Sequence, residues 1–280
     1  MNNKETLGGH TSIGHRMSNA DFIDAHYATC RNSYEAMLRA VGIQPGWHVL
    51  DAGCGSGSFL PLMAELVGPN GKIDAFDLAP ENIDRVKSVV QGWDVPVLTE
   101  VGSLTELPYD DNTFDAIWSA NVTQYFTDHE LTQMLNELVR VVKPGGFVAI
   151  KESDWTTTQF YPLDTYVFWR LFKKNPHLSL WAKRTLNLPS WIKSAGLVEV
   201  SPKTFLEEIR PPLPEIARSF LAGALQFFAK EAEDCMMSEA DMEHWRRCRE
   251  LDSPDNPVNQ ADFYFRDGHT LVVGKKPPSN

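Results

Sequence analysis

The fold of this chain is decided at residues 49–57, Val49-Leu50-Asp51-Ala52-Gly53-Cys54-Gly55-Ser56-Gly57. A short apolar run ends there, glycines follow at alternate positions, and an amphipathic segment continues to Leu66. Glycine lets the backbone turn tightly and lets a ligand lie against main-chain N–H groups. The stretch therefore predicts a strand, a ligand-binding loop and a helix, which together open an α/β sheet.

Two details of this loop indicate the kind of ligand. The dinucleotide-binding pattern GxGxxG requires a third glycine where this chain has Ser58, so the loop is GxGxG. Asp51 precedes the first glycine by two positions. A carboxylate there suits a cationic ligand, such as the amino group or sulfonium of S-adenosylmethionine (SAM), better than a pyrophosphate. A nicotinamide oxidoreductase is the disfavoured alternative, which absence of NADH binding would exclude.

Strands and helices alternate after the loop. Strands are expected at 47–50, 72–76, 95–100, 114–119 and 147–151, with a sixth within 195–209. Helices are expected at 21–40, 80–90, 131–142 and 214–230. Short apolar strands separated by helices predict a parallel sheet covered on both faces. Residues 262–275 supply the last strand, with a hairpin turn expected at 266–269.

Four linked motifs then carry a family resemblance. They are VLDAGCGSGSFL (49–60), IDAFDLAPENI (73–83), LPYDDNTFDAIWS (107–119) and LVRVVKPGGFVAI (138–150). In their order and spacing, about residues 35–152 resemble the class I SAM-dependent methyltransferases, especially the ubiquinone/menaquinone C-methyltransferase-like branch. The resemblance implies a Rossmann-like, seven-stranded, mostly parallel sheet with helices on both faces, an antiparallel last strand and a helical lid.

The resemblance also implies which residues hold the cofactor. The methionine part of SAM would lie against Asp51, Gly53, Cys54, Gly55 and Asn121, the ribose against Asp77 and Leu78, and the adenine against Ser103 and Leu104. Asp77 follows the second strand, where a carboxylate can accept hydrogen bonds from ribose hydroxyls, although an aspartate there can also cap the next helix. Ser103 departs from the family, which commonly has aspartate at this position.

Methyl transfer mainly requires alignment and exclusion of water, with a base where the acceptor is a hydroxyl or an acidic carbon. Candidate catalytic residues are Glu152, His26 and Tyr125, with His177 a further possibility by location. Candidate substrate residues are the aromatic side chains Tyr27, Trp155, Trp169 and Phe172. The aromatic and basic stretch 165–193 is interpreted as an acceptor cap whose charges face water, the alternative being a membrane-surface helix.

The expected organisation has four parts. A flexible N-terminus covers 1–20, the SAM-binding core 21–152, an aromatic and basic cap insertion 153–192, and the completion of the sheet 193–280 with a helical insertion at 210–258. The expected activity is transfer of a methyl group to O, N or C of a small, hydrophobic or aromatic metabolite of secondary metabolism, releasing S-adenosylhomocysteine (SAH). A SAM-binding protein that catalyses a cyclase or pericyclic reaction, or only binds, is the alternative.

Composition narrows the partners. The 280 residues carry a net charge of −11, which disfavours nucleic acid as a substrate. No apolar run approaches the roughly 18 residues of a membrane-spanning helix, and the start has no secretory signal pattern. The four cysteines lack metal-site spacing, so no metal is expected. Reduced cysteines are typical of the cytoplasm, which is the expected location. A monomer and a homodimer both remain open.

Overall fold

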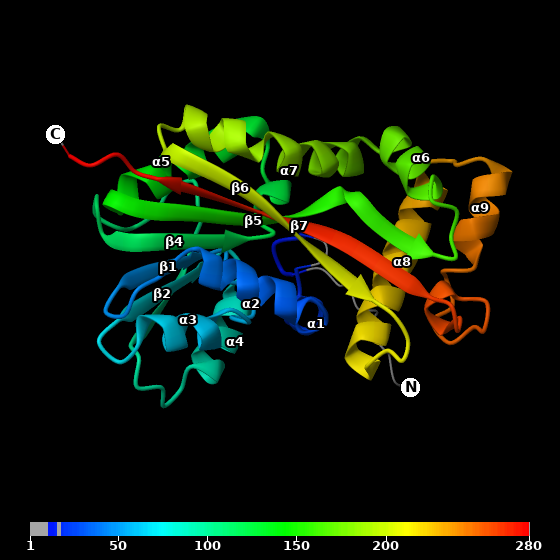
Figure 1. The fold of residues 1–280 in the computed structure, drawn as a ribbon, viewed down its shortest axis with the longest axis horizontal. Coiled ribbons are helices and arrows are strands. Elements are labelled where there is room, and N and C mark those ends of the chain that lie inside the picture. The colour runs from blue at the N-terminus through cyan, green and yellow to red at the C-terminus, as the bar shows by residue number, and fades with distance from the viewer. Residues whose placement is uncertain (1–10, 16–17, 280) are drawn as a thin grey trace.

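The structure is a computed structural model that describes residues 11–15 and 18–279. Residues 1–10 and 16–17 of the N-terminus that was expected to be flexible lie outside the described residues. A seven-stranded sheet crosses the whole molecule in the order β3-β2-β1-β4-β5-β7-β6 (Figure 1). Its strands are β1 His48–Ala52, β2 Lys72–Asp77, β3 Val97–Val101, β4 Phe114–Ala120, β5 Val142–Tyr161, β6 Val198–Ile209 and β7 Tyr264–Lys275.

The strand directions confirm the predicted fold class. Strands β3, β2, β1, β4 and β5 pair in parallel, whereas β7 lies antiparallel between β5 and β6. The helices are α1 Ala20–Thr29, α2 Arg31–Ala40, α3 Leu60–Val67, α4 Pro80–Val89, α5 Asp128–Val141, α6 Val167–Lys174, α7 Pro176–Ser194, α8 Glu215–Asp234 and α9 Glu239–Arg246, with short 3-10 turns η1 Thr123–Tyr125 and η2 Pro257–Asn259. This is the Rossmann-like arrangement of parallel strands with crossover helices.

Alternation along the strands builds the layers of the core. Val49 of β1 packs with α2, α3 and α4, while its neighbour Leu50 packs with α5 and α7 on the opposite face. Figure 1 shows these two helical layers on either side of the sheet. Both side chains are fully buried, as strands covered on both faces require.

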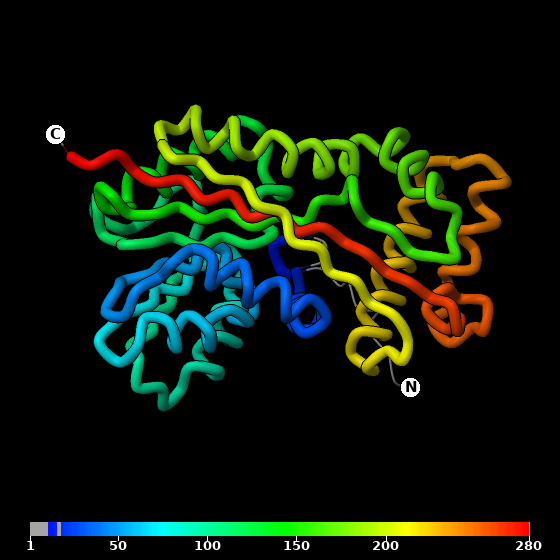
Figure 2. The backbone as a smooth tube through the Cα atoms, in the orientation of Figure 1, coloured from blue at the N-terminus to red at the C-terminus, as the bar shows by residue number. Residues whose placement is uncertain are grey.

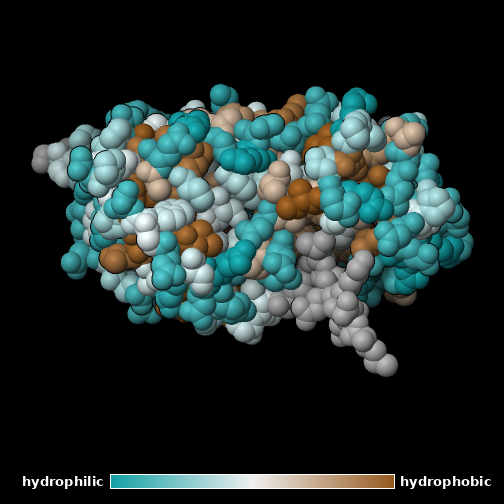
Figure 3. Space-filling view, turned by 90° about the horizontal axis from the view of Figure 1, so that it is seen from below, coloured by the Kyte–Doolittle hydropathy of each residue, from teal (hydrophilic) through white to brown (hydrophobic). Residues whose placement is uncertain are grey.

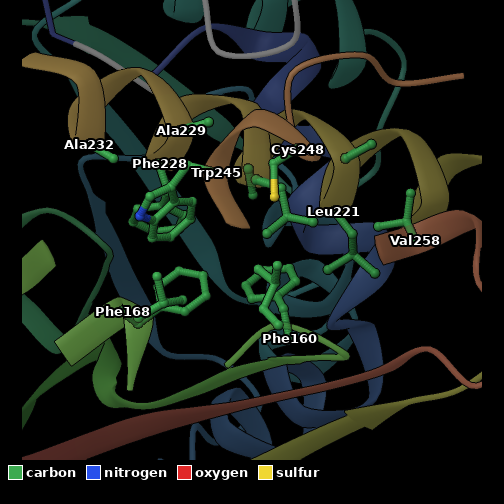
Figure 4. Close-up of a cluster of buried hydrophobic side chains, with 14 of the residues drawn as sticks. Phe160, Phe168, Leu221, Phe228, Ala229, Ala232, Trp245, Cys248 and Val258 are labelled. Carbon is green, nitrogen blue, oxygen red and sulfur yellow. The ribbon is translucent and has the colours of Figure 1, made fainter. Parts of the chain in front are cut away.

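A separate core lies beyond the central sheet. It joins α1, α6, α8 and α9 to the far ends of β5 and β7, through Phe160, Phe168, Phe228, Trp245 and Phe265. Figure 4 shows Phe160, Phe168, Phe228 and Trp245 pointing toward one another from different elements. Residues of the expected helical insertion at 210–258 therefore share this core with α1, α6 and the ends of β5 and β7.

Strand β5 is longer than its sequence pattern indicates. Residues 153–161, expected to belong to the cap insertion, continue β5, and Phe160 pairs with Phe265 of β7. Figure 2 shows β5, β6 and β7 running beside one another from the sheet to the α6, α8 and α9 region. The cap is thus built directly on extensions of the sheet.

The hairpin turn expected at 266–269 is wrong, because β7 runs through these residues without a break. Gly268 donates its N–H to Thr157 Oγ1 at 2.7 Å, and a Cβ there would lie 2.4 Å from that oxygen. This glycine therefore permits a close approach between strands rather than a turn.

The surface combines hydrophilic and hydrophobic side chains (Figure 3). In the face seen in Figure 3, hydrophilic side chains cover most of the molecule and hydrophobic ones form separate patches. Within the described residues, no helix combines the length and apolarity that crossing a bilayer would require.

Candidate functional site

One cavity of about 290 Å3 joins the glycine loop to the separate aromatic core. Its wall includes Gly53, Cys54 and Gly55 after β1, and Asp77 at the end of β2. Its other side is formed by aromatic residues from α1, α8, β5 and β7. The cavity therefore lies at the carboxyl edge of the parallel strands, where α/β folds bind their ligands.

The glycine loop is fixed to the neighbouring strand. The N–H groups of Gly53 and Cys54 donate to the carbonyl of Phe76 at 2.8 and 3.0 Å. Gly53 has a φ of 81°, and a Cβ there would lie 2.5 Å from Val122 Cγ2. At Gly55, with a φ of 53°, a Cβ would lie 2.9 Å from Ile23 Cδ1 of α1. A side chain at either position would require a strained backbone and would displace Val122 or Ile23, so both positions favour glycine.

Asp77 fixes two backbone segments and faces the cavity. Its carboxylate accepts the N–H of Gly55 at 2.8 Å and the N–H of Ala79 at 2.9 Å, which fixes the glycine loop and the start of α4. The side chain also lines the cavity. Burial raises the pKa of this carboxyl, while the donated hydrogen bonds oppose that rise.

Asp51 lies behind the loop with an unsatisfied oxygen. The residue is 1% exposed, and its Oδ2 has no hydrogen-bond partner among the described residues. Burial, together with the charge of Asp77, raises the pKa of Asp51 to about 8. A buried carboxylate without a partner is costly, so a cationic ligand that reached this oxygen would supply the missing partner. SAM, with its amino group and sulfonium, fits this requirement.

The residues predicted for the adenine and ribose lie together in the wall. Leu78, Ser103 and Leu104 all line the cavity near Asp77. The Ser103 hydroxyl is engaged with Thr105 Oγ1 at 2.7 Å and accepts the Thr105 N–H at 3.2 Å. Ser103 therefore fixes its own turn, while Leu78 and Leu104 give this part of the wall apolar surface.

Asn121, predicted beside the methionine end, lines the cavity. It has a φ of 58°, the left-handed conformation that asparagine tolerates better than most residues. Its N–H donates to the carbonyl of Lys151 at 2.8 Å, and its Oδ1 accepts from Lys151 Nζ at 2.7 Å. The turn after β4 is thereby tied to β5.

The predicted bases separate into two groups. His26 and Tyr125 line the cavity, and Tyr125 stacks on His15 at 4.6 Å between ring centroids. Glu152 does not line it: its carboxylate accepts the N–H groups of Val122 and Thr123 at 3.0 and 2.7 Å. Glu152 thus holds the turn after β4 in place.

His177 also lies away from the cavity, at the first turn of α7, where its N–H bonds to Asn175.

The predicted substrate residues separate similarly. Tyr27 and Trp155 line the cavity, whereas Trp169 is 49% exposed on α6 and Phe172 is buried behind Trp155. The aromatic wall contains further residues that were not singled out from the sequence: Phe22, Phe160, Phe220, Phe228 and Phe265. The common helical face of Phe220 and Phe228 could have indicated two of them.

A buried polar cluster beside this wall was also missed. Tyr34, Lys151, Ser153, Asp267 and His269 are all less than one tenth exposed, and Ser153, Tyr34 and Asp267 line the cavity. The run Lys151-Glu152-Ser153-Asp154 at the end of an apolar strand was the available signal. Buried polar groups next to a cavity commonly mark function.

Part of this chain is similar in sequence to known proteins. Residues 49–146 match the family described as a methyltransferase domain. An uncharacterised 37.1 kDa protein of transposon Tn4556 from Streptomyces fradiae is 32% identical over 133 residues, covering 47% of this chain and 38% of that protein. A demethylmenaquinone methyltransferase from Symbiobacterium thermophilum is 28% identical over 171 residues, covering 58% and 61%. The chain therefore spans less than two thirds of the length of both relatives.

A solved structure shows the same fold. The phosphoethanolamine N-methyltransferase 2 of Haemonchus contortus, in complex with SAM, superposes with a TM-score of 0.52 at 18% identity, covering 88% of this chain and 52% of that one. Residues 49–146 thus match a methyltransferase domain, and the chain has the Rossmann-like fold of class I methyltransferases. Within that class, the motifs of this chain are similar to those of the demethylmenaquinone methyltransferases, as the sequence predicted.

Proposed function

We propose that this chain transfers a methyl group from SAM to O, N or C of a small, largely apolar metabolite and releases SAH. The observation that carries the proposal is the continuity of one cavity. The same cavity touches the glycine loop and Asp77 at one side and the aromatic wall at the other. A methyl donor and an apolar acceptor bound there would lie next to each other, which is the alignment that this reaction requires.

The residues of this chain divide the work of binding. Asp51, the glycine loop and Asn121 would hold the methionine part of SAM, and Asp77 and Leu78 the ribose. Ser103 and Leu104 would lie against the adenine. SAM supplies an activated methyl group on a sulfonium. The protein would contribute orientation and the exclusion of water.

The aromatic wall favours an apolar or planar acceptor. Trp155, Phe220 and Phe228 line it, and Trp155 meets Phe228 edge to face at 5.4 Å between ring centroids. Aromatic walls of this kind bury apolar ligands and position them by their ring planes. A metabolite of secondary metabolism with an aromatic or isoprenoid body is the class we propose.

The location of the protein and its oligomeric state are separate questions. All four cysteines are free, which supports the cytoplasm as the proposed location. The oligomeric state, monomer or homodimer, remains open. Sedimentation of the purified protein measures it directly.

Calorimetric titration tests the cofactor site. Wild type is expected to bind SAM and SAH with micromolar affinity, and Asp77→Ala to weaken both by about 10- to 100-fold, since hydrogen bonds to a charged group contribute about 1.5–3 kcal/mol. Asp84→Ala, an exposed aspartate on α4, is the matched control. A folded wild type that binds neither compound would overturn the proposal.

Methyl transfer itself is tested by mass-spectrometric detection of SAH with a panel of apolar phenols, quinols and isoprenoids. SAH together with a product heavier by one methylene unit supports the reaction. Binding of SAM without formation of SAH or of a methylated product would favour the non-methylating alternative.

A further inference from the structure

A chain of hydrogen bonds leads from the cavity wall into the interior of the protein. The ring nitrogen Nε2 of His26 and the hydroxyl oxygen of Tyr34 are 2.7 Å apart. Nζ of Lys151 lies 2.7 Å from the same hydroxyl oxygen and 2.7 Å from Asn121 Oδ1. His26 and Tyr34 line the cavity, whereas Lys151 is fully buried. These three groups come from α1, α2 and β5.

The chain reaches the cavity where the cofactor and acceptor sides meet. The His26 ring stacks on Phe220 of the aromatic wall, with 4.6 Å between ring centroids. At its other end, Lys151 bonds to Asn121, which belongs to the cofactor side. A molecule bound against the aromatic wall would therefore present its reacting group near His26.

His26 has one ring nitrogen free for such a group. Within residues 11–15 and 18–279, no hydrogen bond involves Nδ1 of His26. Burial and the positive charge of Lys151 hold the pKa of His26 well below its usual range, so the ring is neutral. A neutral imidazole with a free nitrogen can accept a proton there while it releases the proton on the other nitrogen.

Lys151 is placed to take that proton. It faces Cys30 and Tyr34 from the α1–α2 segment, Glu152 from its own strand, and Asp267 and His269 from β7. Burial lowers the pKa of Lys151 to about 8, while the carboxyl groups of Glu152 and Asp267 oppose this shift. A buried lysine of this kind is neutral in part of the molecules near physiological pH.

We propose that His26, Tyr34 and Lys151 form a proton relay that deprotonates the methyl acceptor, whose reacting group is a hydroxyl or an acidic carbon on a largely apolar molecule. This inference rests on the proposed function. It makes His26 the catalytic base, with Tyr34 and Lys151 as positioning residues that act through it.

The transfer balances without any further reactant. The acceptor's O–H or C–H bond breaks, its proton passes to Nδ1 of His26, and the acceptor keeps the electron pair. The proton on Nε2 passes to the Tyr34 oxygen, and the Tyr34 hydroxyl proton passes to Nζ of neutral Lys151. Lys151 ends as an ammonium group and the two intermediate residues end neutral.

The relay predicts a change in His26 that is measurable without an acceptor. Charged Lys151 donates to Tyr34, which then donates to Nε2 of His26, so the ring proton lies on Nδ1. Neutral Lys151 accepts from Tyr34, which then accepts from Nε2–H, so the ring proton lies on Nε2. The tautomer of His26 should therefore switch from Nδ1–H to Nε2–H as the pH rises through about 8.

Two-bond 15N–1H correlation spectra of the full chain, labelled at histidine nitrogen, test this switch with and without SAH. His26→Gln assigns the signals of His26 by removing them. We expect the switch in wild type and its loss in Tyr34→Phe, which removes only the hydroxyl, and in Lys151→Met. Tyr109→Phe, which removes a half-buried hydroxyl outside the cavity, should behave as wild type.

A His26 tautomer that stays constant from about pH 6 to 10 in wild type would overturn the relay. A switch that persists in Tyr34→Phe would overturn it equally. Because Tyr34→Phe keeps the buried ring, the test does not depend on whether Lys151→Met folds. The spectra require no turnover, so this failure is distinct from a failure to bind SAM or to methylate.

Discussion

At the scale of single residues, the glycine loop depends on backbone conformation and on space together. Gly53 and Gly92 have the same φ of 81°, yet a Cβ at Gly53 would lie 2.5 Å from Val122 Cγ2, while nothing lies within 4 Å of one at Gly92. The pair therefore separates the cost of a left-handed conformation from the cost of displacing the Val122 side chain.

Gly92→Ala should lower the free energy of unfolding by about 1–2 kcal/mol, the cost of a left-handed residue with a side chain. Gly53→Ala should cost more, because it also displaces Val122, and it should weaken SAH binding at least tenfold. Urea denaturation and calorimetry measure the two effects. Equal losses in both variants, with SAH affinity retained, would contradict this account.

Asp51 makes stability depend on pH. Its pKa is raised to about 8 in the folded protein, above the roughly 3.9 of an aspartate in an unfolded chain. Between these values the folded state holds a proton that the unfolded chain has lost, so the free energy of unfolding falls as the pH rises. The penalty is absent below about pH 4 and complete above about pH 8.

Asp51→Asn removes this titration. Without ligand, the variant should lose less stability than wild type between about pH 5 and 8, whereas Asp84→Asn, at an exposed position, should follow wild type. Urea denaturation across this range gives the comparison. Parallel curves for Asp51→Asn and wild type would show that Asp51 is ionised in the free protein.

At the scale of elements, the side chain of Asn175 joins helix α7 to helix α8. Asn175 caps α7 by accepting the N–H groups of His177 and Leu178 at 3.0 and 3.2 Å. Its Nδ2 also donates to Glu231 of α8 at 2.7 Å, and both residues are less than one tenth exposed. The start of α7 is thus fixed to the last turn of α8.

Asn175→Ala should lower the free energy of unfolding by about 2 kcal/mol, since a cap and a buried hydrogen bond contribute about 1 kcal/mol each. Asn19→Ala removes the cap of α1, which accepts the N–H of Phe22 at 2.8 Å, and should cost only about 1 kcal/mol. Chemical denaturation ranks the two. A smaller loss at Asn175 than at Asn19 would show that the link to α8 contributes nothing.

At the scale of the whole molecule, the cavity lies between the central sheet and the separate core of the cap. Helix α1 contributes Phe22, Ile23 and His26 to its wall, and the Phe22 ring meets Phe220 of α8 at 5.2 Å between centroids. Helix α9 belongs to the same core but contributes nothing to the wall. Ligand binding should therefore stabilise α1 more than α9.

Hydrogen exchange at short times measures this difference. At about 100 times its dissociation constant, SAH adds about 2.7 kcal/mol of stability to the bound state. Exchange should slow most in Ala20–Thr29 and in the 53–57 loop, with no change in Glu239–Arg246. Equal slowing in α9 would indicate that the cap responds as one rigid unit with the cofactor site.

The sequence by itself determined the class of fold and the cofactor loop. Local rules are sufficient there: apolar runs define the strands, glycines mark the turn at residues 53–57, and Asp77 follows its strand at a fixed place. The length of β5 and the continuity of β7 through residues 266–269 were not predictable in the same way. Residues 153–161 and 266–269 pair with each other across more than a hundred positions, and turn-forming residues such as Gly268 can sit within a strand when a neighbour requires close approach.

Which of the predicted residues meet in the cavity depends on tertiary contacts. Glu152 follows the fifth strand as expected, but its carboxylate is engaged by the turn after β4. The polar run that begins at Lys151 does not reveal its partners. His26 and Tyr34 meet Lys151 because α1 and α2 pack over the end of the sheet. Strand and loop identity are encoded by neighbours in the chain, whereas a buried polar network depends on contacts between distant segments.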